Sequence, residues 1–375
     1  MESKSKSKNI REKFRTYILP GVVFQAVIVG GGYATGREIV EYIAKFGASG
    51  LFSATAATLA LALFLILGFE FVRTFKTYDY RNLMKNLLWK GYWAFDILYI
   101  SMLIVIIAVL IAGASSLAED IAGIPYSVAL AIVTVAIGIL CYFGRSWLEK
   151  YKIVGSILLY TLYTALFIVV GLAAKDRIAN TFVLSTNVGE AMNSGFIYAM
   201  YNLVVFFGIL YALDAIKTRK EAVFAAIFAA VWGTIPLWIT YIIYMGFYPA
   251  VLDAAVPWYP VILKAFPQIL PFYIFVFAYI VVASNAGLLN AINDRINTQL
   301  SESGRELSKT YRGLISAGIF LFAAFLANFG IIDLIAKGYR AMAYGFIILF
   351  AIPLATIGVV RILKPDWKED FWKRA

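Results

Sequence analysis

The chain has 375 residues, of which 62% are hydrophobic and 15% are charged, whereas soluble domains carry roughly 25% charged residues. The single cysteine, Cys141, and the lack of histidine exclude an intrachain disulfide and remove the commonest metal ligand. A formal net charge of +11 would suit a nucleic-acid partner, but in a membrane protein lysine and arginine mark the side on which a loop lies.

Apolar runs long enough to cross a bilayer, about 20 residues for a core of roughly 30 Å, recur along the whole chain. They lack the two-residue alternation of barrel strands, so each crossing must be a helix that satisfies its own backbone groups. We therefore predict an all-α membrane protein. Ten transmembrane helices are expected, at residues 16–46, 49–73, 91–118, 125–143, 147–173, 190–216, 221–248, 269–293, 312–328 and 331–361.

With ten helices, most of the 33 basic residues fall in loops on one side, from Lys4 to Arg15 at the start to Arg361 to Arg374 at the end. The positive-inside rule then places both termini in the cytoplasm and the chain in the cell membrane. The charge thereby follows from topology, and the expected partner surface is the lipid bilayer rather than nucleic acid. We expect a cytoplasmic segment at 1–15, one transmembrane domain at 16–361 and a cytoplasmic tail at 362–375.

Ten helices divide into five plus five around the loop 174–189, as repeat one at about 16–173 and repeat two at about 190–361. An odd number of helices per repeat makes the two repeats inverted, an architecture in which the substrate site lies at their interface near the midplane. The first helix of each repeat, helix 1 and helix 6, should then be discontinuous. The segment 78–89 is amphipathic and suits the cytoplasmic interface, and 249–268 is the longest external connection.

Helix 1 contains Gly30, Gly31, Gly32 and Gly36 within seven residues, followed at once by two charged residues. Each glycine costs a helix about 1 kcal/mol relative to alanine. Unwinding at membrane depth would expose backbone groups to a cation or a carboxylate. Close helix packing through small residues is the alternative, but it does not account for the adjoining charges. The candidate substrate-binding residues in helix 1 are Gly31, Gly32, Tyr33, Thr35 and Gly36.

Helix 6 and helix 8 add polar groups at membrane depth. Asn202 should face protein or water, and Phe206 and Phe207 could form the wall of a substrate pocket. Lipid contact is the alternative for the two phenylalanines. In helix 8, Ser284 and Asn285 offer the oxygen ligands that a hard cation such as sodium prefers, or they form interhelical hydrogen bonds instead.

The segment 30–39, Gly-Gly-Gly-Tyr-Ala-Thr-Gly-Arg-Glu-Ile, resembles the YkvI-type bacterial membrane proteins, relatives of the amino acid–polyamine–organocation superfamily with the leucine-transporter fold. The resemblance implies transport of amino acids or related nitrogenous solutes, driven by sodium or protons. It implies a sodium site at the carbonyls around Val29 and Gly32 together with helix 8 at Ser284 and Asn285. Proton-coupled members place a helix 5 lysine there, and Lys152 lies on helix 5 close to its cytoplasmic edge. We favour a sodium ion as the coupling ion and expect no other cofactor.

The resemblance also suggests ion pairs that act as gates. The inner pair would join Arg11 or Arg15 to Asp294, and the outer pair would join Arg37 to Asp333. Local pairs on one helix face, Arg37 with Glu41 and Asp333 with Lys337, are the equally plausible alternative.

Together these features predict a secondary active transporter of a small solute rather than an enzyme. No set of acid, base and nucleophile is recognisable for an intramembrane enzyme. A drug/metabolite-type transporter also has ten helices, but its helices are typically shorter. A solute sensor that retained the fold without turnover would carry the same sequence features. Substrate identity and oligomeric state are not indicated by the sequence.

Overall fold

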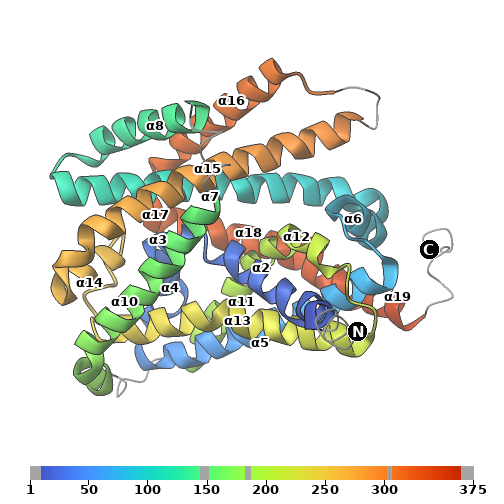
Figure 1. The fold of residues 1–375 in the computed structure, drawn as a ribbon, viewed down its shortest axis with the longest axis horizontal. Coiled ribbons are helices and arrows are strands. Elements are labelled where there is room, and N and C mark those ends of the chain that lie inside the picture. Colours follow the sequence, from blue (N-terminus) through green and yellow to red (C-terminus); the bar gives the residue numbers. More distant parts are fainter. Residues whose placement is uncertain (1–9, 144–151, 182–186, 302–303, 305, 365–375) are drawn as a thin grey trace, which may run out of the picture.

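The computed structural model describes residues 10–143, 152–181, 187–301, 304 and 306–364, and these residues are helical wherever they are regular (Figure 1). The predicted all-α class is therefore confirmed. The ends of the expected terminal segments, 1–9 and 365–375, and the expected start of helix 5 at 147–151 lie outside the described residues.

The first half of the chain begins with a broken helix, which is followed by three long helices, α5, α7 and α10, and the shorter α8. The break divides helix 1 into short pieces, whereas α5 has 26 residues and α7 has 31. In chain order the elements are η1 (Phe14–Ile18), α2 (Leu19–Ile28), α3 (Gly31–Thr35), α4 (Arg37–Tyr42), η2 (Ala44–Ser49), α5 (Gly50–Phe75), α6 (Tyr80–Leu88), η3 (Trp89–Gly91), α7 (Tyr92–Ala122), α8 (Tyr126–Phe143) and α10 (Lys152–Thr181).

The second half repeats this order with nearly equal lengths. A broken helix again comes first, then helices of 27, 8, 32 and 19 residues match α5, α6, α7 and α8 with their 26, 9, 31 and 18. The elements are α11 (Val188–Asn202), α12 (Val204–Gly208), η4 (Leu210–Leu213), α13 (Arg219–Met245), α14 (Trp258–Ala265), η5 (Pro267–Ile269), α15 (Leu270–Ser301), α16 (Lys309–Ala327), α17 (Gly330–Asp333), η6 (Leu334–Tyr339), α18 (Arg340–Phe346), η7 (Ile347–Ala351), η8 (Leu354–Gly358) and α19 (Val359–Leu363).

Contacts between the two halves are exchanged symmetrically. Helix α2 packs on α13 as its counterpart α11 packs on α5, and α7 packs on α16 as α15 packs on α8. Figure 1 shows α7, α8, α15 and α16 gathered on one side of the molecule, with α2, α5, α11 and α13 on the other. It also shows α6 and α14, which are counterparts in sequence order, at opposite ends. The chain is thus a five-plus-five inverted repeat, as predicted.

Two of the ten crossings, helix 1 and helix 6, are discontinuous, and α8 is short. The other seven crossings in the described chain are long and apolar enough to span a membrane by length and composition. Exposed apolar side chains such as Leu59, Ile132 and Phe325 lie on their outer faces, as expected of surfaces that contact lipid.

The helix ends differ from the expected ones by a few residues, with two larger differences. Helix α10 continues to Thr181 and α15 to Ser301, eight residues beyond the predicted ends. Polar residues there reduce hydropathy, but they do not interrupt a helix that extends out of the hydrocarbon layer. Helix α13 begins with a capping box in which Thr218 and Glu221 satisfy each other's backbone N–H groups.

We name the end of the molecule at which η1, α6 and α19 lie the basic end, and the opposite end the α14 end (Figure 1). The name follows from the charges of the loops there, including Arg73, Lys217 and Arg312. At this end α6 is held against helix 10, because the Arg361 guanidinium donates to the Asn86 carbonyl oxygen.

Glycines bring helices into close contact at equivalent places in the two halves. A Cβ on Gly195 of α11 would lie 1.9 Å from the Ser53 carbonyl oxygen of α5, and a Cβ on Gly21 of α2 would lie 3.1 Å from the Ala229 Cα of α13. These are close backbone approaches that only glycine permits.

We expect Gly195→Ala to destabilise the folded protein by about 1–3 kcal/mol, because the α5 and α11 backbones must separate to admit the methyl group. Gly318→Ala on α16 is the matched control, since nothing lies within 4 Å of its Cβ position. Thermal unfolding midpoints of the purified variants in detergent would measure the difference. Equal midpoints would contradict the close contact.

Candidate functional site

A cavity of about 670 Å³ lies where the two broken helices face α7 and α15. Its walls come from α2, α7, α10, α12 and α15, and Gly30, Glu38 and Asn202 lie at its inner end. Asp294, whose side chain is 69% exposed, lines it at the basic end. The cavity therefore runs from the middle of the molecule toward the basic end.

Helix 1 is interrupted twice beside this cavity. The backbone leaves helical geometry at Val29 (ψ 11°) and Gly30 (ψ −144°), and Gly36 adopts a left-handed conformation at φ 75°. A Cβ at Gly36 would also lie 1.8 Å from the Tyr244 hydroxyl, so glycine is required there both for conformation and for space. The predicted break between Val29 and Gly36 is confirmed.

Helix 6 is interrupted less sharply. Its hydrogen bonds change to a spacing of three residues after Leu203, where Phe206 N–H donates to the Leu203 carbonyl, and again where Ile209 N–H donates to Phe206. Asn202 lies at the first change and lines the cavity, while its Nδ2 donates to the Tyr198 carbonyl oxygen at 2.9 Å. Its side-chain oxygen is left to accept from another donor.

Glu38 is a buried acid at the inner end of the cavity. It is 5% exposed, and the Tyr201 hydroxyl donates to its Oε2 at 2.7 Å. Within the described residues it forms no ion pair with a basic side chain. Removing a carboxylate from water costs several kcal/mol unless a cation or several donors compensate, so this position favours a proton or a positively charged ligand.

Tyrosines close the molecule beyond Glu38, toward the α14 end. Tyr163 donates to the Tyr33 carbonyl oxygen at 2.5 Å and Tyr273 to the Ala34 carbonyl oxygen at 2.8 Å. The Tyr198 hydroxyl donates to the Tyr33 hydroxyl at 3.1 Å. Because these tyrosines come from α10, α11 and α15, they attach the short helix α3 to three surrounding helices. We name them, with Tyr33, the tyrosine layer.

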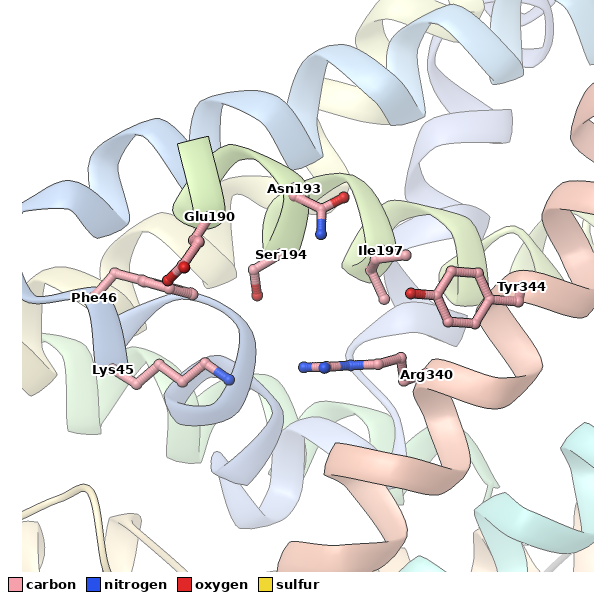
Figure 2. Close-up of a pocket in the computed structure, with 8 residues that line it drawn as sticks. All are labelled: Lys45, Phe46, Glu190, Asn193, Ser194, Ile197, Arg340 and Tyr344. Carbon is pink, nitrogen blue, oxygen red and sulfur yellow. The ribbon is translucent and has the colours of Figure 1, made fainter. Parts of the chain in front are cut away.

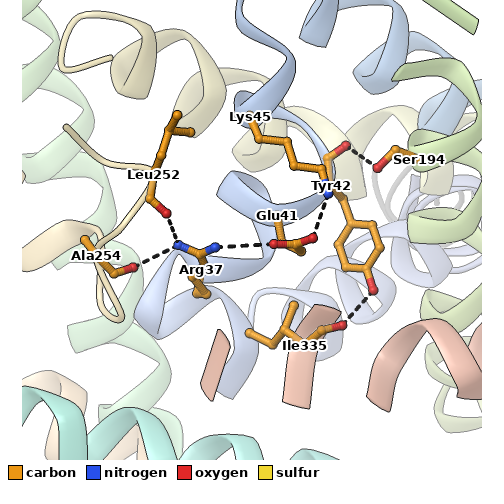
Figure 3. A network of polar contacts seen from close by, with 8 residues as sticks. All are labelled: Arg37, Glu41, Tyr42, Lys45, Ser194, Leu252, Ala254 and Ile335. Carbon is orange, nitrogen blue, oxygen red and sulfur yellow. Dashed lines mark hydrogen bonds and ion pairs between the residues drawn. The ribbon is translucent and has the colours of Figure 1, made fainter. Parts of the chain in front are cut away.

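Outside the tyrosine layer, an ionic network holds the second half of helix 1 to the segment before α14 (Figure 3). Arg37 donates to the carbonyl oxygens of Leu252 at 2.5 Å and Ala254 at 3.1 Å, and it pairs with Glu41 at 3.3 Å. Lys45 binds the other oxygen of Glu41 at 2.6 Å. The α14 end is thus closed, while the cavity extends to the basic end.

The predicted substrate residues divide into two groups. In the first group, Asn202 lines the cavity, and Gly31 and Gly32 directly follow Gly30, which also lines it. Tyr33, Thr35 and Gly36 are buried in or beside the tyrosine layer and do not line the cavity. Phe206 and Phe207 are also buried, but they pack with Phe350 and other aromatic rings toward the basic end instead of lining it.

The predicted cation ligands are also only partly brought together. Ser284 lines the cavity, and so does Gly30, the neighbour of Val29. Asn285 is fully buried outside the cavity lining, and its Nδ2 donates to the Val281 carbonyl oxygen at 2.7 Å. This bond lies within α15, so it is neither a cation contact nor the interhelical hydrogen bond expected as the alternative. Among the described residues the Asn285 Oδ1 has no hydrogen-bond partner. The Lys152 side chain lies outside the described part of the chain.

In this conformation the residues of the expected gate pairs bind other partners. Arg15 pairs with Asp214 at 2.8 Å and Asp294 pairs with Arg312 at 3.2 Å, while Arg11 is exposed. The expected inner pair is thus absent in this conformation, in which Arg15 and Asp294 each bind another residue. The expected outer pair is replaced by the local ones, Arg37 with Glu41 and Asp333 with Lys337 at 3.0 Å. A gating role in another conformation stays a prediction.

Sequence reasoning missed Glu38 and, apart from Tyr33, the tyrosines as site residues. The sequence held a signal for each. For the tyrosines it was their number, 24 in a chain without histidine. For Glu38 it was the position of an acid inside a membrane span, which by default indicates function. Within the described ranges, no group of three or more His, Cys, Asp or Glu side chains could hold a metal ion.

No protein-family model and no curated protein sequence matches this chain. Among solved structures, it is similar to a manganese transporter of Eremococcus coleocola in complex with an aromatic bis-isothiourea substituted compound, at 15% identity and a TM-score of 0.49, over 94% of this chain and 78% of the other. It is also similar to a Na⁺-coupled sialic acid symporter in a substrate-bound outward-open state, at 14% identity and a TM-score of 0.44, over 93% and 87% of the two chains. Both likenesses concern the arrangement of helices alone.

The cavity predicts one-sided access to its wall. In a Cys141→Ser background, a cysteine introduced at Ala283, which lines the cavity, should react with a membrane-impermeant thiol reagent from the basic end only. Ala230→Cys is the control, because Ala230 is fully buried in α13. Labelling in right-side-out and inside-out vesicles measures the side. Reaction of Ala283→Cys from the α14 end would contradict the closed tyrosine layer.

Proposed function

We propose that this chain is a secondary active transporter that moves a small amino acid or related nitrogenous solute across the cell membrane by alternating access. The observation that carries the proposal is a cavity that is open at one end and stops at two broken helices of an inverted repeat. Binding sites of transporters with inverted repeats lie at such breaks near the midplane. An intramembrane enzyme would need a nucleophile held against a base, and within the described residues Ser284 of the lining forms no hydrogen bond with Glu38 or Asp294.

The positive-inside rule supports the orientation. If the basic end is cytoplasmic, the described conformation is open to the cytoplasm and closed to the outside. The tyrosine layer and the Arg37 network are then the contacts that must separate when the molecule opens outward.

Glu38 supports the choice of a nitrogenous solute. An ammonium group at the inner end of the cavity would compensate the buried carboxylate through a charge-assisted hydrogen bond. Asn202 lies beside it with a side-chain oxygen that can accept from the same ligand. A neutral or purely anionic solute would leave Glu38 uncompensated, unless Glu38 were protonated.

Sodium is the coupling ion that we favour. Gly30 and Ser284 face the same cavity, and carbonyl and hydroxyl oxygens are the ligands of a hard cation. Val29, Gly32 and Asn285 would complete the site only after a local rearrangement. A proton carried by Glu38 is the competing coupling mechanism, and a sensor that binds without turnover is the competing function.

We expect purified protein in proteoliposomes to accumulate members of a pool of labelled amino acids and amines when an inward sodium gradient is imposed. Uptake driven by a proton gradient without sodium would overturn sodium coupling but retain transport. Saturable binding without uptake under either gradient would identify a sensor. Ser284→Ala should raise the sodium concentration required for half-maximal uptake if Ser284 is a ligand.

We expect Glu38→Gln to reduce uptake at least tenfold, because the amide removes the charge that pairs with the ammonium group. The variant should fold, since a buried amide costs less than a buried carboxylate. Glu306→Gln, at an exposed acid far along the chain, is the matched control and should transport normally. Wild-type uptake by Glu38→Gln would contradict the assigned role.

A further inference from the structure

A second cavity, of about 280 Å³, lies at the α14 end between η2, α11 and α18. It shares no lining residue with the larger cavity. We name it the Lys45–Arg340 pocket after the two basic residues that line it. Figure 2 shows their side chains pointing toward one another across the pocket, Lys45 from η2 and Arg340 from the start of α18.

Arg340 is a charge without a counter-charge. It lies in the span Gly330–Leu363, directly after the π-helical segment η6. Its guanidinium forms no ion pair with any residue of the described chain. Arginine inside a membrane span is expensive unless it pairs with an acid or faces water, and Arg340 is exposed beside the pocket that it lines. π-Helical turns are frequent at functional sites, and η6 ends at Tyr339, directly before Arg340.

The charges around the pocket do not balance. Lys45 is bound to Glu41, but Glu41 also pairs with Arg37. Glu41 does not line the pocket itself, and the acid in the lining is Glu190, in the first turn of α11. Two basic side chains, Lys45 and Arg340, therefore face one carboxylate within the lining, which leaves the lining with a net positive charge.

The other polar groups of the pocket suit an acceptor ligand. Asn193 and Tyr344 line it with an amide and a hydroxyl that can both donate. The Ser194 hydroxyl is already used, because it donates to the Tyr42 carbonyl oxygen at 2.9 Å. In Figure 2 Tyr344 lies on the same side of the pocket as Arg340, with its hydroxyl pointing toward the middle of the view, and Asn193 lies on α11 across from Arg340.

We propose that the Lys45–Arg340 pocket binds an oxyanion, a carboxylate or a phosphate group, at the α14 end of the protein. The planar guanidinium of Arg340 binds two oxygens of the anion side by side, as arginine does with carboxylate and phosphate, and the Lys45 ammonium adds a point charge. Such a group could belong to an anionic lipid or to a soluble anion. The site does not depend on the identity of the transported solute.

Two probes distinguish these sources. Native mass spectrometry of the purified protein would compare retention of phosphatidylglycerol with that of zwitterionic phosphatidylcholine. Thermal unfolding in detergent without added lipid would measure stabilisation by inorganic phosphate and by acetate. Both measurements would be made on wild type, Arg340→Gln, Lys45→Gln and a control, Lys337→Gln. Lys337 lies one turn before Arg340 on the same helix but outside the pocket lining.

Preferential retention of phosphatidylglycerol that is lost in Arg340→Gln and weakened in Lys45→Gln, but kept in Lys337→Gln, supports the site with a lipid as its ligand. A rise in unfolding temperature with phosphate or acetate that shows the same pattern supports a soluble anion. The proposal is overturned if neither probe distinguishes wild type from Arg340→Gln and Lys45→Gln. It is also overturned if Lys337→Gln loses binding to the same extent, since the effect would then be one of net charge.

Discussion

The unwound backbone of helix 1 is the constraint on which the rest of this structure depends. Carbonyl groups that leave a helix at membrane depth have no water to bind, so side chains must satisfy them. Tyr163 and Tyr273 do so for Tyr33 and Ala34. The need to satisfy these two carbonyls thus determines which helices meet at the centre, where the cavity ends and which end of the molecule is closed.

The two halves of the repeat use this architecture unequally. Helix 1 carries the glycines, the left-handed turn at Gly36 and the buried Glu38, whereas helix 6 contributes Asn202 and changes its hydrogen bonding without a left-handed residue. An inverted repeat therefore supplies the framework twice, while the chemistry lies mainly on its first half. Tyr201 and Tyr198, from helix 6, act chiefly as partners of groups on helix 1.

Most of the fold could be predicted from the sequence, because crossing a bilayer requires long apolar runs and the basic loops test their number. The break in helix 1 could be predicted because four glycines leave few alternatives. The residues of the site were harder to predict from the sequence. Phe206 and Phe207 pack into an aromatic cluster and not into the cavity. The sequence could not predict this, because a phenylalanine in a span fits either location equally well. Asp294 pairs with Arg312 and not with Arg11 or Arg15. The sequence could not predict this partner, because ion pairs depend on the conformation and not on the residue types alone.

The tyrosine layer also bears on the speed of any conformational cycle. Its hydrogen bonds attach one five-residue helix to α10, α11 and α15 at once, so α3 cannot leave one partner without straining its contacts with the others. Each bond contributes only about 0.5–1.5 kcal/mol, yet several must break together while new partners form for the carbonyls. Opening of the α14 end would then have a large activation enthalpy, and the rate of a complete cycle would rise more steeply with temperature than solute binding does.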